Sequence, residues 1–432
     1  MEKFIKLAER MGADGAEVFS QQSKIYEYLT LNDVIHQKEF DNDEGYGVRV
    51  LRGGRIGFSF FSDEKNAVEA IRLALKMSKF SEECRIEFPH KKKYARAPSF
   101  DKKIEHMDER DAKEMLNAML SAISEKAKPT ECMLTHGMAR VEIVNSGGLR
   151  AQDSHTMLSL HAQARAGNSI GHDAGASSYL ACVNAEKIGE RAGKLARRMV
   201  GARQTQTRKT TLIFESCALH ELLSMMLAPA VNGERARRGI SFFCGKKGAR
   251  VASESLTVCD DPLLPRALGT RAFDGEGSAS RKKFLIRKGV FNEFLYDVRT
   301  LSLMSKNGAD GGTPGNAMRG GYTSLPRISP SNIVVGRGGV DDVVADCDDG
   351  LLIHSFMGEH TSNELTGDFS VQTNVAFEIS GGEERGPVKA ALISGNFFEL
   401  MKNVQGIEKK RQMYFSLLSP RIAFSGVQAI GR

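Results

Sequence analysis

Residues 47–61 read GVRVLRGGRIGFSFF and predict a β-hairpin near the N-terminus. Two β-rich runs flank Gly53-Gly54, a pair that favours the tight turn of a two-residue hairpin. An alternating segment from Ile25 to Leu31 precedes this hairpin. Amphipathic patterns predict one helix over Met1–Met11 and another over Glu64–Lys79. The N-terminal part is therefore expected to be a helix-plus-hairpin unit.

A second unit of similar outline follows. A predicted helix over Asp108–Ala127 leads into a β-rich stretch from Glu131 to Tyr179, which the turn Asn145-Ser146-Gly147-Gly148 interrupts. A helix over Ala185–Arg198 closes the unit, and residues 81–105 are interpreted as a linker. The likeness of the two units suggests an old duplication.

From Lys209 onward the pattern changes to short strands with many glycines, and helices are expected only near Glu215–Leu227 and Phe397–Asn403. We expect an α+β protein in which two helix-plus-hairpin units precede a large, glycine-rich, mainly β domain. The expected domains are an N-terminal domain at 1–100, a middle domain at 101–207 and a C-terminal domain at 208–432.

The composition is that of a globular protein, with 432 residues, 41% hydrophobic residues and 26% charged residues. Seven cysteines without a C-x-x-C pair favour free thiols in a reducing compartment over a disulfide framework or a zinc ribbon. The charged stretch Met1–Met11 is interpreted as an amphipathic helix and not as a secretory signal. Apolar stretches such as Leu222–Val231 are too short to span a bilayer. We therefore expect a cytoplasmic protein without membrane contact.

The net charge of +7 does not by itself indicate nucleic-acid binding. The densest basic run, His90-Lys91-Lys92-Lys93, lies in a Pro-flanked stretch and has no interleaved aromatic residues. We interpret it as a solvated linker.

The dipeptide His220-Glu221 on a predicted helix is a candidate zinc site, because zinc peptidases hold the metal with imidazoles on one helical face beside a carboxylate base. The second imidazole of such a helix would stand at position 224 or 225. These positions hold Ser224 and Met225, neither of which replaces a histidine. The pattern therefore predicts no working zinc site here.

A second group comprises His354, Glu359, His360, Glu364 and Asp368. His360 and Glu364 would share a face if the segment were helical, and could then bind a divalent ion. The Thr-Gly-Asp sequence at 366–368 favours a hydrogen-bonded loop instead.

Two further segments have weaker signals. The acidic stretch at 341–349 lacks the spacing of a calcium-binding EF-hand loop and is interpreted as a solvated turn. The glycine-rich stretch from Gly308 to Asn316 matches no phosphate-binding motif, but its backbone could cradle an anion or let an extended peptide lie close.

Six phrases in chain order resemble the TldD/PmbA metallopeptidase family, which is also labelled a modulator of DNA gyrase. These phrases are Gly12-Ala13-Asp14-Gly15-Ala16-Glu17-Val18, Gly45-Tyr46-Gly47-Val48-Arg49-Val50, Asp260-Asp261-Pro262, Phe273-Asp274-Gly275-Glu276-Gly277, Met357-Gly358 with Thr366-Gly367-Asp368-Phe369-Ser370, and Ile393-Ser394-Gly395-Asn396. Together they extend over nearly the whole chain.

The resemblance implies a metal-dependent role for a partner and not for this chain. TldD-type subunits of the family carry an H-E-x-x-x-H helix and a further cysteine ligand near the C-terminus. Here the helix reads His220-Glu221-Leu222-Leu223-Ser224-Met225, and no cysteine follows Cys347. The chain is similar to the TldE/PmbA type, which pairs with a TldD-type catalytic subunit to process unfolded or modified peptides. We therefore expect no metal or other cofactor in this chain, zinc in the partner, and a heterodimer or homodimer.

We further expect two segments to line a groove for extended peptide, with Gly311, Gly312 and Asn316 in one and Thr366, Gly367, Asp368 and Phe369 in the other. Two alternatives stay open. The chain could be an autonomous zinc peptidase that uses His220, Glu221, His354 and His360. It could instead be a homodimeric protein that modulates a nucleic-acid enzyme such as DNA gyrase.

Overall fold

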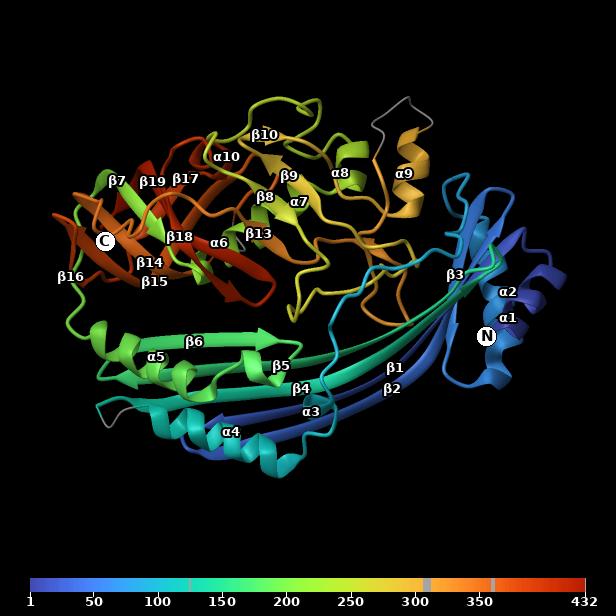
Figure 1. Ribbon diagram of the computed structural model, residues 1–432, viewed down its shortest axis with the longest axis horizontal. Helices are drawn as coiled ribbons and strands as arrows, with labels where there is room; N and C mark the ends of the chain where they lie inside the picture. Colours follow the sequence, from blue (N-terminus) through green and yellow to red (C-terminus); the bar gives the residue numbers. More distant parts are fainter. Residues whose placement is uncertain (124–125, 306–311, 359–361, 432) are drawn as a thin grey trace.

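The computed structural model describes residues 1–123, 126–305, 312–358 and 362–431. Helices account for 21% of the chain and strands for 42%, which confirms the predicted α+β class. A long, curved six-stranded sheet forms one side of the molecule, and the mainly β C-terminal domain lies along it (Figure 1). In the described part of the chain, no helix has the length and apolar character that crossing a membrane requires.

The six-stranded sheet contains two copies of one pattern, helix, three strands and helix. The first copy consists of α1 (Glu2–Arg10), β1 (Gly15–Leu31), β2 (Val34–Arg52), β3 (Arg55–Phe61), the 3-10 turn η1 (Glu64–Asn66) and α2 (Ala67–Ser78). The second consists of α4 (Glu109–Ala122), β4 (Lys128–Asn145), β5 (Arg150–Ala166), β6 (Ser169–Ser177), the 3-10 turn η2 (Leu180–Cys182) and α5 (Ala185–Arg198). The strand order β3-β2-β1-β4-β5-β6 joins the copies through their first strands, which run antiparallel.

A glycine occupies the same place in each copy, the third residue of the third strand. A Cβ at Gly57 would lie 1.8 Å from the carbonyl oxygen of Ala74 on α2, and a Cβ at Gly171 would lie 2.1 Å from the backbone nitrogen of Ala196 on α5. Only glycine lets the backbones approach this closely. The shared device supports the duplication that the sequence suggested.

The expected hairpin is present, with Arg52 opposite Arg55 and Gly53-Gly54 between them. Both glycines have positive φ angles, 57° and 70°, as the predicted turn requires. The predicted boundaries at residues 100 and 207 stay predictions, although β1 and β4 pair directly across the first of them. The segment expected to be a linker ends in a short helix, α3 (Lys102–Glu105).

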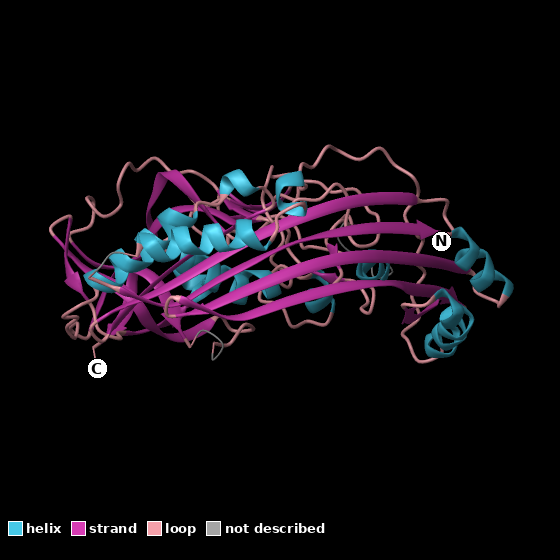
Figure 2. Cartoon of the chain, turned by 90° about the horizontal axis from the view of Figure 1, so that it is seen from below, coloured by secondary structure: helices cyan, strands magenta, loops and turns pink. Residues whose placement is uncertain are grey.

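The two faces of the long sheet bury different partners. Alternate residues point to opposite faces, so Val18 and Val144 pack with α1 and α2, whereas Phe19 and Ile143 pack with Phe273 of the C-terminal domain. Helices α4 and α5 cover the other end of the sheet (Figure 2), where they form a separate core with β4 and β5.

The C-terminal domain is built on an 11-stranded sheet. Five of its strands, β19-β17-β15-β14-β7, close into a barrel because β19 also pairs with β7. The strands of this sheet are β7 (Arg208–Phe214), β8 (Val258–Asp260), β9 (Lys283–Arg287), β10 (Val290–Phe291), β13 (Ile333–Val335), β14 (Asp349–Met357), β15 (Asp368–Ser380), β16 (Glu383–Pro387), β17 (Leu392–Asn396), β18 (Val404–Tyr414) and β19 (Leu417–Ile430). A separate pair is formed by β11 (Ala317–Met318) and β12 (Arg327–Ile328).

The predicted helix at Glu215–Leu227 is not one regular helix. It comprises α6 (Ser216–Leu222), a π-helical turn η3 (Leu223–Leu227) and α7 (Ala228–Ala230). Pro229 has no N–H to continue the α-helical ladder, which accounts for the irregular turn before it. The predicted helix at Phe397–Asn403 is shorter, α10 (Phe397–Leu400). Helices α8 (Gly233–Arg237) and α9 (Val298–Ser305) were not predicted from the sequence.

A buried ion network joins the long sheet to the C-terminal domain. Arg49 of β2 lies directly opposite Glu17 of β1, and their side chains form a 2.8 Å ion pair. The same guanidinium pairs with Glu276 of the C-terminal domain, and Arg319 of that domain pairs with Glu17. The exposed fractions are 2% for the arginines and 0% for the glutamates. Burial lowers the pKa of Arg49, but Glu17 and Glu276 raise it by more, so the guanidinium stays charged.

Replacing Arg49 with methionine is expected to destabilise the protein by about 3–5 kcal/mol, because the buried Glu276 would lose its cation and Glu17 would keep only Arg319. Denaturant unfolding measures this change. Arg72→Met is the control, since Arg72 pairs with Glu69 on the surface and its loss is expected to cost less than about 1 kcal/mol. Equal losses in the two variants would contradict the structural role of the network.

His136 of β4 is buried, with an exposed fraction of 1%, and stacks on Tyr26 with ring centroids 4.9 Å apart. Burial lowers the pKa of His136 to about 4. The unfolded chain binds a proton at this ring below its ordinary pKa of about 6.5, whereas the folded chain does so only near pH 4. Acid therefore favours unfolding in this interval.

We expect the protonation of His136 to lower the free energy of unfolding of the protein by about 2–3 kcal/mol as the pH drops from about 7 to about 4. His136→Phe, which keeps the aromatic stack without a titrating group, is expected to reduce that loss. Urea unfolding at several pH values compares the two proteins. Parallel pH profiles would show that His136 does not cause the acid sensitivity.

Candidate functional site

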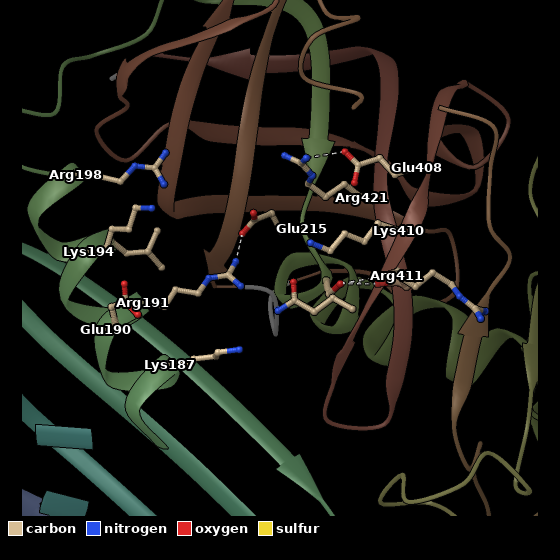
Figure 3. Close-up of a pocket in the computed structure, with 14 residues that line it drawn as sticks. Lys187, Glu190, Arg191, Lys194, Arg198, Glu215, Glu408, Lys410, Arg411 and Arg421 are labelled. Atoms are coloured by element: carbon tan, nitrogen blue, oxygen red, sulfur yellow. Dashed lines mark hydrogen bonds and ion pairs between the residues drawn. The ribbon is translucent and has the colours of Figure 1, made fainter. Parts of the chain in front are cut away.

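A basic cavity of about 420 Å³ lies where α5 faces β18 and β19 (Figure 3). Helix α5 and the two strands bring to it residues that are far apart in the chain. Its charged lining consists of Lys187, Glu190, Arg191, Lys194, Arg198, Glu215, Glu408, Lys410, Arg411 and Arg421. The cavity therefore lies at the interface between α5, which packs on the long sheet, and the C-terminal domain.

Cations outnumber carboxylates in this lining, and only some of them are paired. Arg191 pairs with Glu215 at 2.7 Å, and Arg421 pairs with Glu408 at 2.8 Å (Figure 3). Three further cations of the lining are lysines. Within the part of the chain that the structure describes, none of these lysines forms an ion pair: Lys187, Lys194 and Lys410. Unpaired ammonium groups around a concave surface favour the binding of an anionic group.

Glu215 connects the cavity to a buried histidine. Its Oε2 atom accepts a hydrogen bond from Nδ1 of His354 at 2.7 Å and also contacts Arg191. Burial raises the pKa of Glu215, but His354 and Arg191 outweigh it and lower the pKa to about 2. This carboxylate is therefore ionised at neutral pH.

The predicted zinc-helix position lies on α6 and η3, at a smaller cavity of about 210 Å³. His220 and Ser224 line this cavity together with hydroxyl groups, including those of Ser331 and Ser416. The His220 ring packs against Phe415, with centroids 5.7 Å apart. Its pKa is lowered by burial.

The other two residues of the predicted zinc helix, Glu221 and Met225, have contacts that stabilise the fold. Glu221 accepts a hydrogen bond of 3.0 Å from the backbone N–H of Phe356, and Met225 packs against the hydrophobic core of the C-terminal domain. His220 supplies one imidazole, and serine hydroxyl groups and apolar side chains line the cavity beside it. This is not the donor set of a zinc peptidase, which needs further imidazole, thiolate or carboxylate ligands. The residues at this position do not fit the zinc site that TldD-type subunits carry.

The second candidate group, for which a hydrogen-bonded loop was favoured over a divalent-ion site, can be compared only in part, because Glu359 and His360 lie outside the described residues. His354 is buried and lies beside Glu215, whereas Glu364 pairs with Arg235 at 3.3 Å. Asp368 accepts a hydrogen bond of 2.7 Å from the Thr366 hydroxyl, as expected of a hydrogen-bonded loop.

The first groove segment is part of a buried polar cluster. Asn316 is 1% exposed and its side-chain oxygen accepts a 2.6 Å hydrogen bond from Nζ of Lys283. Asn316 also donates to Asp260. Burial lowers the pKa of Lys283 to about 8. A Cβ at Gly312 would lie 2.4 Å from the ring of Tyr296, and Gly311 lies outside the described residues.

The second groove segment is a tight turn at the start of β15. Gly367 has a φ angle of 85° and packs against Phe398, and Phe369 is buried in the core. Asn396 donates a 2.9 Å hydrogen bond to Asp368. The peptide-binding role of both segments stays a prediction.

The basic cavity itself was missed in the sequence, although one signal for it exists. Lys187, Glu190, Arg191, Lys194 and Arg198 recur every three or four residues, so they share one face of α5. No local pattern shows that β18 and β19 lie opposite this face.

Three family models match successive parts of the chain. They are the PmbA/TldA metallopeptidase domain 1 at residues 16–78, the central domain of that family at 94–200 and its C-terminal domain at 207–431.

Individual relatives match over nearly the whole chain. A Methanocaldococcus jannaschii protein described as uncharacterized is 30% identical, with 99% of each chain covered. A Buchnera aphidicola metalloprotease PmbA homolog is 23% identical, covering 99% of this chain and 95% of its own. The crystal structure of TldE from Thermococcus kodakarensis superposes with a TM-score of 0.90 at 26% identity, and all of both chains is covered. These matches establish that the chain belongs to the PmbA/TldD metallopeptidase family.

Proposed function

We propose that this chain is the TldE-type subunit of a peptide-processing complex, and that a TldD-type partner holds the zinc ion and performs the hydrolysis. The observation that carries this proposal is the environment of His220, where Ser224 and Met225 take the positions of a second imidazole. A chain with this helix supplies binding surface and not the catalytic cation. The whole-length likeness to TldE supports the same role.

The basic cavity suggests how the subunit contributes to peptide binding. Lys187, Lys194 and Lys410 present ammonium groups that complement carboxylates of a peptide, at its C-terminus or on acidic side chains. The cavity has polar and charged walls, so it favours a peptide end over an apolar side chain. We propose that it anchors an anionic group of the substrate while the partner cleaves elsewhere.

We expect the chain, co-expressed with a TldD-type relative from the same source, to co-purify as a heterodimer that cleaves an unstructured peptide. His220→Ala in this chain is expected to change the cleavage rate by less than about twofold, because His220 is not a zinc ligand. Thermal melting checks that the variant is folded. Chelator-sensitive cleavage by this chain alone, abolished in His220→Ala, would establish the autonomous-peptidase alternative.

Reversing two charges, as Lys194→Glu with Lys410→Glu, is expected to weaken binding of a glutamate-rich peptide by at least about tenfold, since one charge-assisted hydrogen bond contributes about 1.5–3 kcal/mol. Fluorescence anisotropy measures the affinity. The matched control is Lys65→Glu with Lys76→Glu, which makes the same charge change beside and on α2. An equal loss in both variants would indicate an effect of net charge and not of the cavity.

A further inference from the structure

Three metal-ligating side chains from three separate elements converge next to the basic cavity. They are His172 on β6, Cys217 on α6 and His354 on β14. One ligand atom from each lies within 4.8 Å of the other two. Among the described residues, this is the one such group, and it does not include His220.

The cluster is shielded from solvent. Cys217 is 3% exposed and His354 is 2% exposed, and His172 is partly buried. His354 occupies an irregular point of β14, where the pairing with β15 skips from Ile353 to Ser355. Such a bulge redirects a side chain, and here the redirected ring faces His172, with ring centroids 5.4 Å apart.

Each imidazole has a polar group beside its other ring nitrogen. Nδ1 of His354 donates to the Glu215 carboxylate at 2.7 Å, which leaves Nε2 for a metal. Nδ1 of His172 lies 3.4 Å from the side-chain amide of Asn374, whose oxygen can accept the ring proton when the amide is turned. Histidine ligands of metals commonly donate their second nitrogen to a carboxylate or carbonyl in this way.

The ligand types favour zinc. A thiolate with two imidazoles suits Zn²⁺, which binds nitrogen at about 2.0–2.1 Å and sulfur at about 2.3 Å. A tetrahedral ion with these bonds separates its ligand atoms by about 3.3–3.6 Å. The side chains therefore need to close by about 1 Å, and Nε2 of His354 must exchange its 3.2 Å contact with the His172 carbonyl for the metal.

We propose that His172, Cys217 and His354 bind one Zn²⁺ ion that fastens the long sheet to the C-terminal domain. β6 belongs to the sheet, whereas α6 and β14 belong to the C-terminal domain, so the ion would bridge the two. Water or Glu221, whose Oε1 lies 3.8 Å from the sulfur of Cys217, completes the coordination. This site does not use His220, although Cys217 and Glu221 lie on the same helix as that residue. It goes beyond the proposed function, because it requires no partner chain.

The experiment uses the full chain without an affinity tag, first stripped of metal with a chelator. We expect Zn²⁺ to bind with a stoichiometry of one and to raise the Tm, and Co²⁺ to produce the intense absorption of a thiolate–cobalt bond. Cys217→Ser is expected to remove the cobalt band and to weaken zinc binding at least about 100-fold. Glu215→Gln, which weakens the hydrogen bond that orients His354 and also removes the ion pair with Arg191, is expected to weaken it about 10–100-fold.

The control is Cys182→Ser, which removes an exposed cysteine outside the cluster and should leave metal binding unchanged. His172→Gln gives a second test in case Cys217→Ser does not fold. Absence of stoichiometric zinc, or a cobalt spectrum that is the same in the wild type and in His172→Gln, would overturn the proposal. Peptide cleavage is not measured, so this outcome is independent of the proposed function.

Discussion

The buried pairing of Arg49 with Glu17 and Glu276 is the constraint on which the arrangement of the whole molecule depends. Three charged groups that are inaccessible to water must meet, and the free energy of leaving one unpaired exceeds what most single contacts contribute. The requirement fixes how β1 and β2 lie against the C-terminal domain. The basic cavity at the other end of the interface then forms at a defined place between α5 and β18.

Much of the local structure could be predicted from the sequence. The Gly53-Gly54 turn and the helix Ala185–Arg198 were located correctly, because turn geometry and helical periodicity depend on neighbouring residues. Three of the family-like phrases, at 12–18, 45–50 and 273–277, supply Glu17, Arg49 and Glu276. The phrases that carry the resemblance therefore contain three of the four charged residues of the ion network, and Arg319 lies outside them.

Sites formed by distant segments could not be predicted. His172, Cys217 and His354 have no spacing that suggests a metal site, and only the fold brings β6, α6 and β14 together. The absence of a zinc site at His220-Glu221 stays a prediction. None of the seven cysteines, all of which lie in the described part of the chain, forms a disulfide. Barrel closure by β19 and β7 also depends on residues some 200 positions apart.

The junction between β1 and β4 has an evolutionary consequence. Taken alone, each three-stranded half would leave the edge of its first strand unpaired, and an open edge attracts another strand. Two identical ancestral polypeptides related by a two-fold axis would have satisfied both edges in the same antiparallel way. After a gene fusion the two halves could diverge in sequence. The second half now carries the cationic face of α5, whereas the strands of the first pack against α1 and α2.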